Sequence, residues 1–421
     1  MRILHTADLH IGQIIYQYYD REDEHLHFFN LLATWCVTEQ PDALVISGDI
    51  FDTAQPTVTA RRFFAEQMMR LRRQRPDMPI VVIAGNHDSA GRLEAEAALW
   101  HYANIHIIGT APAQDAGSLP QNWQSKYITE IPCKGYIVAV PFYSGSRKAA
   151  IQALLDYVAE RNTDNLPVIQ LAHQWVQGMA GWGSETGNLA EKSQEEFGHG
   201  YDYLALGHIH KPHTLGQAND FLLDGSVQVL PSPVARYSGS ALHVSASEKV
   251  PHTVSVVDIN RHNGEVSIRP LRINQLRHFY TLPESGTAIE TEEQLRQTVQ
   301  AFVDDPARKG YFRLRVKPSL QWENDPDKLV EQIIAGHEDK ARFNPQTLYE
   351  GATVNEQPTD QPSDFEVEDI RQMTDPLEFI RKTIDRYPDI DLQTLESDFL
   401  LISERVRLMD EATNNPNRHN P

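Results

Sequence analysis

Five short polar motifs, each at the end of an apolar run, constrain this 421-residue chain more than any other feature. Their side chains are carboxylates, imidazoles and one amide, with no thiolate among them. In chain order the motifs are Asp8-Leu9-His10, Gly48-Asp49-Ile50-Phe51-Asp52, Gly85-Asn86-His87-Asp88, His173 and Gly207-His208-Ile209-His210. Such ligands suit Mn, Fe or Zn, and two cations about 3.5–4 Å apart can hold a phosphate and activate water. The motifs therefore predict a two-metal phosphoesterase site.

The apolar runs in front of the motifs predict buried strands. Ile3-Leu4 precedes the first motif, Ala43–Ile46 the second and Ile80–Ile83 the third, and helical stretches separate them. This alternation predicts a largely parallel sheet in an α/β fold. In open sheets of this type, ligands collect outside the carboxyl ends of the strands, which is where each motif stands. We therefore expect the motifs to meet at one edge of the sheet.

The spacing within the motifs adds to this expectation. Asp8 and His10 are two residues apart, so an extended segment would point both side chains to the same side. His208 and His210 repeat the pattern. The glycines of the second and third motifs permit a tight turn or a close backbone approach beside a ligand. A single aspartate after a strand is more often a turn residue or a helix cap, but five motifs in order favour metal ligation.

As a set, the motifs D-x-H, G-D-x-x-D, G-N-H-D, H and G-H-x-H resemble those of the calcineurin-like metallophosphoesterases. The resemblance is strong over residues 1–260, and it implies a sandwich of β-sheets flanked by helices. More narrowly, the segments Met1–Gly12, Gly48–Thr53 and Ala205–Lys211 are similar to the bacterial DNA-nuclease branch of this superfamily.

The resemblance implies how seven residues divide between two metal ions. In the family, one ion is held by the residues that match Asp8, His10 and His210, and the other by those that match Asn86, His173 and His208. Asp49 is our candidate for the bridging carboxylate, because its motif is central and one oxygen can serve each ion. His173 stands alone after an apolar run, and many histidines at strand ends are simply hydrogen-bonded, so that alternative stays open.

Two further residues are expected to act in the chemistry without binding metal. In the family, the histidine that matches His87 points at the scissile phosphate, where it stabilises developing charge and helps to protonate the leaving oxygen. General acid catalysis of this kind contributes about 10²–10⁴-fold. Asp52 matches the carboxylate that orients this histidine in related phosphatases, although a loop cap is the alternative. His5 is near enough to the first motif to support a metal ligand from behind.

The nuclease branch implies a manganese-dependent DNA nuclease of repair and recombination. It implies 3′→5′ exonuclease action on double-stranded ends, endonuclease action on single strands or hairpins, and a homodimer joined to a coiled-coil ATPase. The chain has no Gly-x-x-x-x-Gly-Lys-Ser/Thr motif, so ATP hydrolysis would have to come from that partner. The rivals are a phosphatase or a small-molecule phosphodiesterase of the same superfamily, and a scaffold without catalysis. Thr53-Ala54 and Asp88 stand where protein phosphatases have Arg-Gly and Glu, which argues against that class.

Composition limits the partners and the compartment. The net charge of −20 repels phosphate at long range, so a DNA-binding patch must be local or supplied by a partner. Two bound metal ions would add about four positive charges where the phosphate sits. The two cysteines, Cys36 and Cys133, indicate free thiols in a reducing cytoplasm. We expect no signal peptide, since the first motif begins almost at once, and no run approaches the ~20 apolar residues of a membrane span.

The chain is expected to have five parts. They are a nuclease domain (1–270), a smaller α/β DNA-binding, or capping, domain (275–345), a polar linker (350–373), two amphipathic helices that dock on the ATPase (374–410) and a disordered tail (414–421). From residue 341 onward, 8 Lys and Arg face 17 Asp and Glu, so this end is strongly acidic.

Two segments carry more detailed expectations. In the smaller domain, the sequence predicts helices over Glu292–Val303 and Asp327–Ala335 and an alternating strand over Tyr311–Val316. The basic run from Arg61 to Arg75 fits a solvated helix face. The resemblance implies instead that this helix, with the segment Leu93–Trp100, forms the homodimer.

Overall fold

The computed structural model describes residues 1–16, 18–114, 122–177, 191–217, 226–244, 250–317, 326–345 and 348–349. Contacts within the chain define two compact units, Met1–Ala352 and Thr353–Pro421. All described residues belong to the first unit. The predicted linker, the two C-terminal helices and the tail lie outside the described residues.

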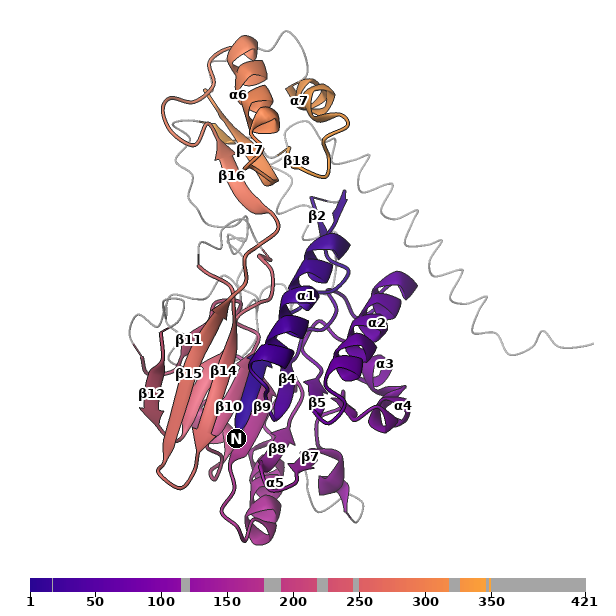
Figure 1. Cartoon of the computed structure of the whole chain (residues 1–421), viewed down its shortest axis with the longest axis vertical. Helices are drawn as coiled ribbons and strands as arrows, with labels where there is room; N and C mark the ends of the chain where they lie inside the picture. Colours follow the sequence, from indigo (N-terminus) through magenta and orange to yellow (C-terminus); the bar gives the residue numbers. More distant parts are fainter. Residues whose placement is uncertain are drawn as a thin grey trace, which may run out of the picture. The chain divides into compact units, whose positions relative to one another are not determined.

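Two mixed β-sheets form the larger part of the first unit (Figure 1). The seven-stranded sheet has the order β12 (Gln228–Pro231), β15 (Glu265–Arg272), β14 (Thr253–Asn260), β1 (Arg2–Thr6), β4 (Ala43–Ser47), β5 (Ile80–Ile83) and β6 (Ile105–Ile108). The six-stranded sheet has the order β11 (His213–Thr214), β13 (Val234–Tyr237), β10 (Tyr203–Gly207), β9 (Val168–His173), β8 (Gly135–Ala139) and β7 (Ile128–Ile131).

The six-stranded sheet is parallel at the centre and antiparallel at both margins, whereas the seven-stranded sheet is parallel on the β1–β6 side and antiparallel on the β14–β12 side. Strands β1, β4, β5 and β6 run parallel, as do β8, β9, β10 and β13. Strands β14, β15, β12, β7 and β11 pair antiparallel. The predicted strands before the motifs are therefore confirmed as a parallel core. The antiparallel margin β14–β15 is a hairpin whose short turn at Gly264 permits no crossover helix.

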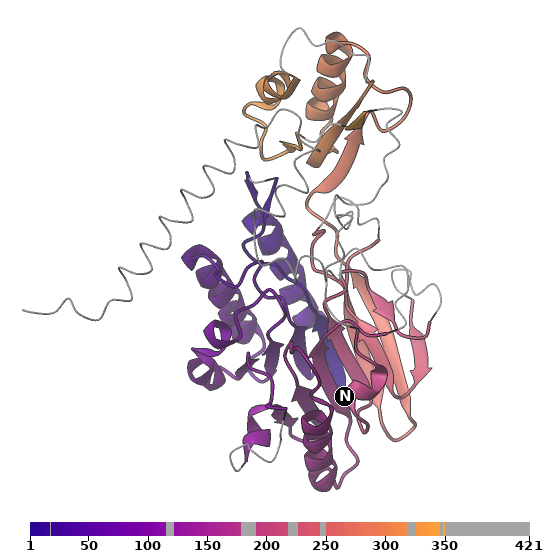
Figure 2. The same ribbon diagram turned by 180° about the vertical axis from the view of Figure 1, so that it is seen from behind.

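The strands are buried on both faces because the two sheets stack between helices. Leu4, Leu44 and Val82 face helices α1 (Glu22–Thr38) and α2 (Val58–Gln74), which lie side by side in Figures 1 and 2. Their strand neighbours Ile3, Val45 and Val81 face the six-stranded sheet, whose far side is covered by α5 (Lys148–Arg161). Alternation along each strand thus fills two hydrophobic cores at once. The remaining helical segments here are α3 (Ala90–Glu94), α4 (Ala97–Tyr102), η2 (Trp123–Lys126) and η3 (Gln194–Phe197).

Residues 278–349 form a smaller sheet with its own hydrophobic core. Its strands are β16 (His278–Leu282), β17 (Gly310–Val316), β18 (Ala341–Phe343) and β19 (Leu348–Tyr349), and its helices are α6 (Glu292–Asp304) and α7 (Pro326–Ile334). Thr291 Oγ1 accepts a hydrogen bond from the amide of Gln294 and caps α6. The two predicted helices and the predicted strand are confirmed, with bounds that differ by one residue. We refer to this region as the small domain.

A short hairpin, β2 (Ile14–Ile15) and β3 (Tyr19–Asp20), links the first motif to α1. Among the described residues, no helix is both long enough and apolar enough to cross a membrane.

Candidate metal centre

The first two motif loops are joined as a continuation of the β1–β4 pairing. The amides of Asp8, Leu9 and His10 donate to main-chain oxygens of Gly48 and Asp49 over 2.8–3.1 Å. These bonds fix the two carboxylate-bearing loops against each other at the carboxyl ends of their strands. The position agrees with the general location of ligand sites in α/β sheets.

Glycines allow the motif loops, within one sheet and between the two sheets, to approach more closely than any side chain would permit. A Cβ atom on Gly48 would lie 2.2 Å from Nδ1 of His173, and one on Gly85 would lie 2.1 Å from Oδ1 of Asp49. At Gly207 it would lie 1.9 Å from the main-chain oxygen of Ser47. All three distances are far below van der Waals contact, so the site requires glycine at these positions.

Four of the predicted ligands have left-handed backbone conformations: φ is 52° at Asp8, 47° at His10, 47° at Asp49 and 101° at His208. Few residues other than glycine adopt such angles, and they persist where the surrounding structure holds them. The expected extended geometry of Asp8-x-His10 and His208-x-His210 is therefore wrong. The side chains still converge, but through tight turns imposed by the loop contacts. These residues lie in loops beyond the ends of the strands, where side chains no longer alternate between two faces.

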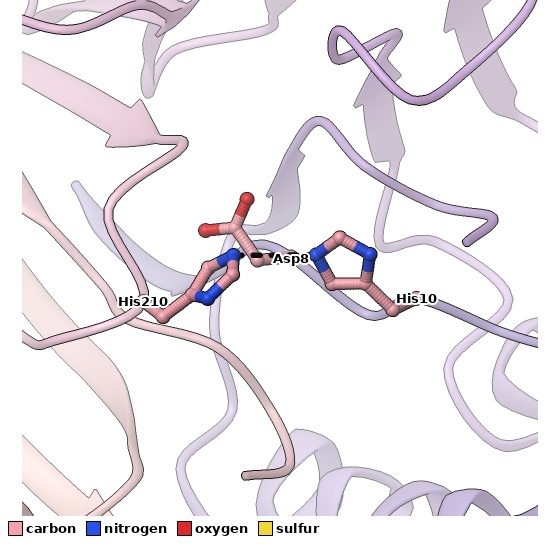
Figure 3. A group of neighbouring side chains, drawn as sticks. All are labelled: Asp8, His10 and His210. Carbon is pink, nitrogen blue, oxygen red and sulfur yellow. Dashed lines mark hydrogen bonds between the residues drawn. The ribbon is translucent and has the colours of Figure 1, made fainter. Parts of the chain in front are cut away.

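Asp8, His10 and His210 form the first group of ligand atoms, which all lie within 4.8 Å of one another. Figure 3 shows the rings of His10 and His210 on either side of Asp8 with their nitrogen-bearing edges toward each other, and their Nε2 atoms are 3.3 Å apart. The carboxylate of Asp8 also accepts the amide of His208 at 3.0 and 3.1 Å. Asp8 and His10 are buried and His210 is partly exposed.

Asn86, His173 and His208 meet in a second group. Oδ1 of Asn86 lies 2.9 Å from Nε2 of His173 and 3.0 Å from Nδ1 of His208. Oδ2 of Asp49 lies 3.3 Å from Nε2 of His173 and 3.9 Å from Nε2 of His10. One carboxylate oxygen thus faces both groups, as a bridging ligand would have to do.

The hydrogen bonds of this second group suit a cation. Nδ1 of His173 donates to the main-chain oxygen of Ser47 at 2.8 Å, so its Nε2 is left to face two oxygen acceptors, on Asn86 and Asp49. The lone pair of Nε2 on a neutral ring would repel these two oxygens at such distances unless a proton or a metal ion lay between them. Among the described residues, Nε2 of His208 and Nδ1 of His10 are also buried without a hydrogen-bond partner. The donor set fits divalent metal ions.

The electrostatics of the group lead to the same conclusion. Burial opposes protonation of His173, but Asp49 and Asp8 outweigh it and raise its pKa to about 9. Burial and the neighbouring His173 lower the pKa of His208 to about 3, so that ring is neutral and can act as a ligand. Burial raises the pKa of Asp8. The two buried carboxylates thus depend on positive charge nearby, which metal ions would supply in place of a proton.

His87 lies exposed at the edge of these groups, with its ring 4.9 Å from that of His10. Its amide donates to Oδ1 of Asp49 at 2.9 Å. Its Nδ1 donates to the main-chain oxygen of Asp52 at 2.9 Å, which leaves Nε2 directed away from that bond. The Asp52 carboxylate was expected to orient His87, but it faces Nδ1 of His10 at 3.4 Å. In this structure the main chain of Asp52 orients His87.

Sequence reasoning gave Asp88 no structural role, yet it joins the second and third motif loops. Its carboxylate accepts the amides of Gly85, Ile50 and Phe51 over 2.9–3.0 Å. Burial and the nearby Asp49 raise its pKa to about 6, against the effect of the three amides. The signal was present in the sequence, because an acidic residue directly after a turn commonly accepts nearby backbone amides.

Two histidines outside the motifs support the loops from behind. His5, which was expected near the site, is buried and bonds to the Tyr203 hydroxyl at 2.9 Å and to Oγ of Ser47 at 3.3 Å. His25 is buried in α1, and its Nε2 donates to the main-chain oxygen of Leu9 at 2.8 Å, between the first two proposed ligands.

Comparison with known families agrees with this geometry. The model of the family described as Calcineurin-like phosphoesterase matches residues 1–212, half of the chain, and this stretch contains all seven proposed ligands. The chain therefore belongs to the calcineurin-like phosphoesterases. Members of this class hydrolyse phosphate esters with divalent metal ions, and the convergent carboxylates and imidazoles provide this chain with a divalent-metal site.

Within that class, the chain is similar to proteins named as the SbcD component of the SbcCD nuclease. It is 29% identical to the one from Rhodobacter capsulatus over 405 residues, which cover 89% of this chain and 92% of the relative. It is 31% identical to the one from Bacillus subtilis, over 61% of this chain and 66% of the relative. It is 30% identical to the one from Escherichia coli K12, over 51% of this chain and 58% of the relative.

Proposed function

We propose that this chain is a manganese-dependent DNA nuclease, the counterpart of SbcD in an SbcCD-like complex for DNA repair and recombination. The observation that carries the proposal is the convergence of Asp8, His10, Asp49, Asn86, His173, His208 and His210 into two adjoining groups that share one oxygen of Asp49. Similarity to relatives that are named nucleases supports DNA as the substrate.

In the proposed reaction, the residues of the first group would hold one ion and those of the second group the other, with Asp49 as a ligand common to both. When bound, the two ions supply Lewis-acid polarisation of the phosphodiester and a water of lowered pKa. The mixture of carboxylates and several imidazoles favours Mn²⁺ over Mg²⁺, which prefers oxygen ligands and retained waters.

The protein's own contribution to bond cleavage falls mainly to His87. Its exposed ring stands beside the ligands, and the Asp52 carbonyl oxygen fixes Nδ1 as a hydrogen donor. A protonated His87 would therefore present Nε2–H to the leaving oxygen as general acid. Exonuclease action from 3′ ends of duplexes and endonuclease action on single strands or hairpins are the expected outcomes.

A homodimer is proposed through α2, α3 and α4. Val58 on α2 is 82% exposed, and Leu99 and Tyr102 on α4 are 71% and 90% exposed, so these helices offer apolar surface to a partner. Beside them, Phe51 and Trp100 line a hollow of about 290 Å³. Two arginines of the basic run bind locally: Arg75 donates to the main-chain oxygens of Cys36 and Pro41, and Arg72 donates to those of Arg75 and Met78.

The test of the proposed function compares substrates in one preparation. Purified protein with Mn²⁺ is incubated with hairpin DNA, with blunt duplex DNA, with a phosphopeptide and with cyclic nucleotides. Cleavage of DNA alone supports the nuclease. Selective hydrolysis of the phosphopeptide or of a cyclic nucleotide would assign the chain to another branch of the superfamily, and no hydrolysis of any substrate would favour a scaffold.

The partner is tested separately by co-expression with an SbcC-like coiled-coil ATPase. We propose that the C-terminal segment docks on that partner and that the small domain contacts DNA. Deletion of residues 365–421 should abolish co-purification and spare Mn²⁺-dependent cleavage of single-stranded DNA, since every proposed ligand lies before residue 211. Full retention of ATPase binding by the shortened chain would exclude this segment as the docking element.

A further inference from the structure

Glu24, in the first turn of α1, is fully buried, yet it is not a metal ligand. Its Oε2 accepts Nη2 of Arg21 at 2.8 Å. Its Oε1 accepts the hydroxyl of Tyr311 and faces Nη1 of Arg277 at 3.5 Å and Nη1 of Arg342 at 3.7 Å. A buried carboxylate is costly unless it is paired and hydrogen-bonded, so the folded chain depends on these partners together.

Three of the four partners belong to the small domain or to the segment that enters it. Tyr311 lies in β17 and Arg342 in β18, and Arg277 directly precedes β16. Arg277 also binds both carboxylate oxygens of Asp23, at 2.8 and 2.6 Å. Arg342 donates to the Tyr311 hydroxyl at 2.9 Å and to the main-chain oxygen of Asp20 at 2.7 Å. The small domain is therefore fastened to the first turn of α1 by charged groups with fixed geometry.

The same turn of α1 is fastened on its other side to the loop that carries the first metal ligands. Nη1 of Arg21 donates to Oε1 of Gln13 at 2.7 Å, and the amide of Gln13 donates to the main-chain oxygen of His10 at 3.1 Å. Next along the helix, His25 holds the main-chain oxygen of Leu9. These bonds act on a loop whose Asp8 and His10 have left-handed backbone conformations.

A loop in such conformations keeps them only while its surroundings hold it. The first turn of α1 is part of those surroundings, and its own position is set by Glu24 and the three small-domain side chains. A buried network of this kind has few alternative arrangements, because any shift leaves a charged group without its partner.

We infer that Arg21 and Glu24 are positioning residues that couple the small domain to the first metal group, so that the placement of the small domain sets the affinity of that group for its metal ion. The inference rests on the proposed function of Asp8 and His10 as ligands. It makes the small domain a control element of the metal centre in addition to its proposed contact with DNA.

The test uses Tyr311→Phe, which removes the hydrogen bond to Glu24 and the one accepted from Arg342 but keeps the ring, whose centroid lies 4.9 Å from that of Phe279 in a stacked arrangement. The matched control is Tyr280→Phe, the same change on the adjacent strand β16, where the ring contacts Phe302. Mn²⁺ binding to the full-length chain is titrated by electron paramagnetic resonance. Turnover is measured on bis(p-nitrophenyl) phosphate, a small diester that offers no DNA for the small domain to bind.

In Tyr311→Phe, one of the two Mn²⁺ dissociation constants, that of the first metal group, should rise at least about fivefold, the lower limit of typical coupling between sites, while the other changes little. kcat on the small diester should fall by a similar factor at saturating substrate and limiting Mn²⁺, with KM nearly unchanged. Tyr280→Phe should match the wild type within about twofold. A purely structural role would lower the melting temperature of Tyr311→Phe and leave Mn²⁺ affinity equal to that of the control, and this result would overturn the coupling.

A second variant keeps the inference testable if Tyr311→Phe alone is too mild. Glu24→Gln retains the size of the side chain and removes its charge, and the double variant with Tyr311→Phe closes a cycle. If both changes act through one contact, their effects on Mn²⁺ affinity will not multiply; independent effects would overturn the coupling. Wild-type protein that binds Mn²⁺ but cleaves no diester would refute the proposed function, while the ratio of Mn²⁺ affinities would still decide the coupling.

Discussion

Substitution of Gly207 by alanine is the sharpest steric test of the metal centre. Gly207 ends β10 and is followed by His208, and its φ lies outside the left-handed region. The added Cβ would lie 1.9 Å from the main-chain oxygen of Ser47, 2.9 Å from Nδ1 of His173 and 3.0 Å from Cβ of Ala7. Alanine at position 207 is therefore excluded by steric overlap of its Cβ atom, and the backbone angles of the position add no strain.

The size of the effect follows from these distances. Ordinary contact begins at 3.4 Å, so the ends of β4 and β10 must separate by about 1.5 Å. The 2.8 Å bond from His173 to Ser47 cannot survive such a shift, and it fixes the orientation of a proposed ligand. Loss of a bond that orients a metal ligand costs about 10–100-fold in metal affinity. Overpacking of this kind also lowers the free energy of unfolding by about 1–3 kcal/mol.

The assay compares Gly207→Ala with Gly91→Ala, a helical position where an added Cβ meets no atom within 4 Å. Mn²⁺ affinity is measured by calorimetry, and stability by urea denaturation of the metal-free protein. Gly91→Ala should retain both properties or gain slightly in stability. If Gly207→Ala binds Mn²⁺ as tightly as the wild type, the two sheets do not meet at the metal centre in the way described.

Three further predictions concern chemistry, metal and pH. His87→Ala should retain both metal ions, because no proposed ligand changes, while DNA cleavage falls by ~10²-fold or more. Metal content is measured by mass spectrometry and turnover on duplex ends, and either lost metal or unchanged turnover would refute the role of His87. DNA cleavage at saturating Mn²⁺ should be much faster than at saturating Mg²⁺, and equal rates would contradict the ligand assignment. Burial and Arg21 lower the pKa of His25 to about 4 from 6.5, so the folded state binds fewer protons than the unfolded state between these values and stability falls as the pH drops through this window. At pH 5, about 2 kcal/mol of the free energy of unfolding should be lost through His25. Denaturation of the metal-free protein at pH 7.5 and 5 should therefore show a smaller loss of stability for His25→Gln than for the wild type. Equal losses in the two proteins would show that His25 does not titrate in this way.

The elements around the site could be predicted from the sequence because their signals are local. Apolar β-branched runs such as Ile80–Ile83 form strands wherever both faces can be buried, and the residues that follow lie at the strand ends. The glycines beside Asp49 and Asn86 indicate that a neighbouring segment approaches the backbone closely at these positions. The order of the motifs places the first three at one edge of the seven-stranded sheet, since parallel strands deliver their carboxyl ends to one edge. The proposed ligands His173, His208 and His210 belong to the six-stranded sheet, and the stacking of the two sheets brings them to the same place.

The hydrogen bonds that position the proposed ligands depend on the tertiary structure, because the two partners of each bond are distant in the chain. Left-handed angles at Asp8 and His10 arise from hydrogen bonds to a loop some forty residues away, and no pattern within the motif specifies them. The main-chain oxygen of Asp52 that binds His87 carries no signature in the sequence. Glu24 gives the strongest contrast. In the sequence it is one acid in a charged helical turn, and only the folded chain shows it buried among side chains 253 to 318 residues away. Apolar periodicity reports which face of an element is buried, but the pairing of a buried charge is decided by what the whole chain brings to it.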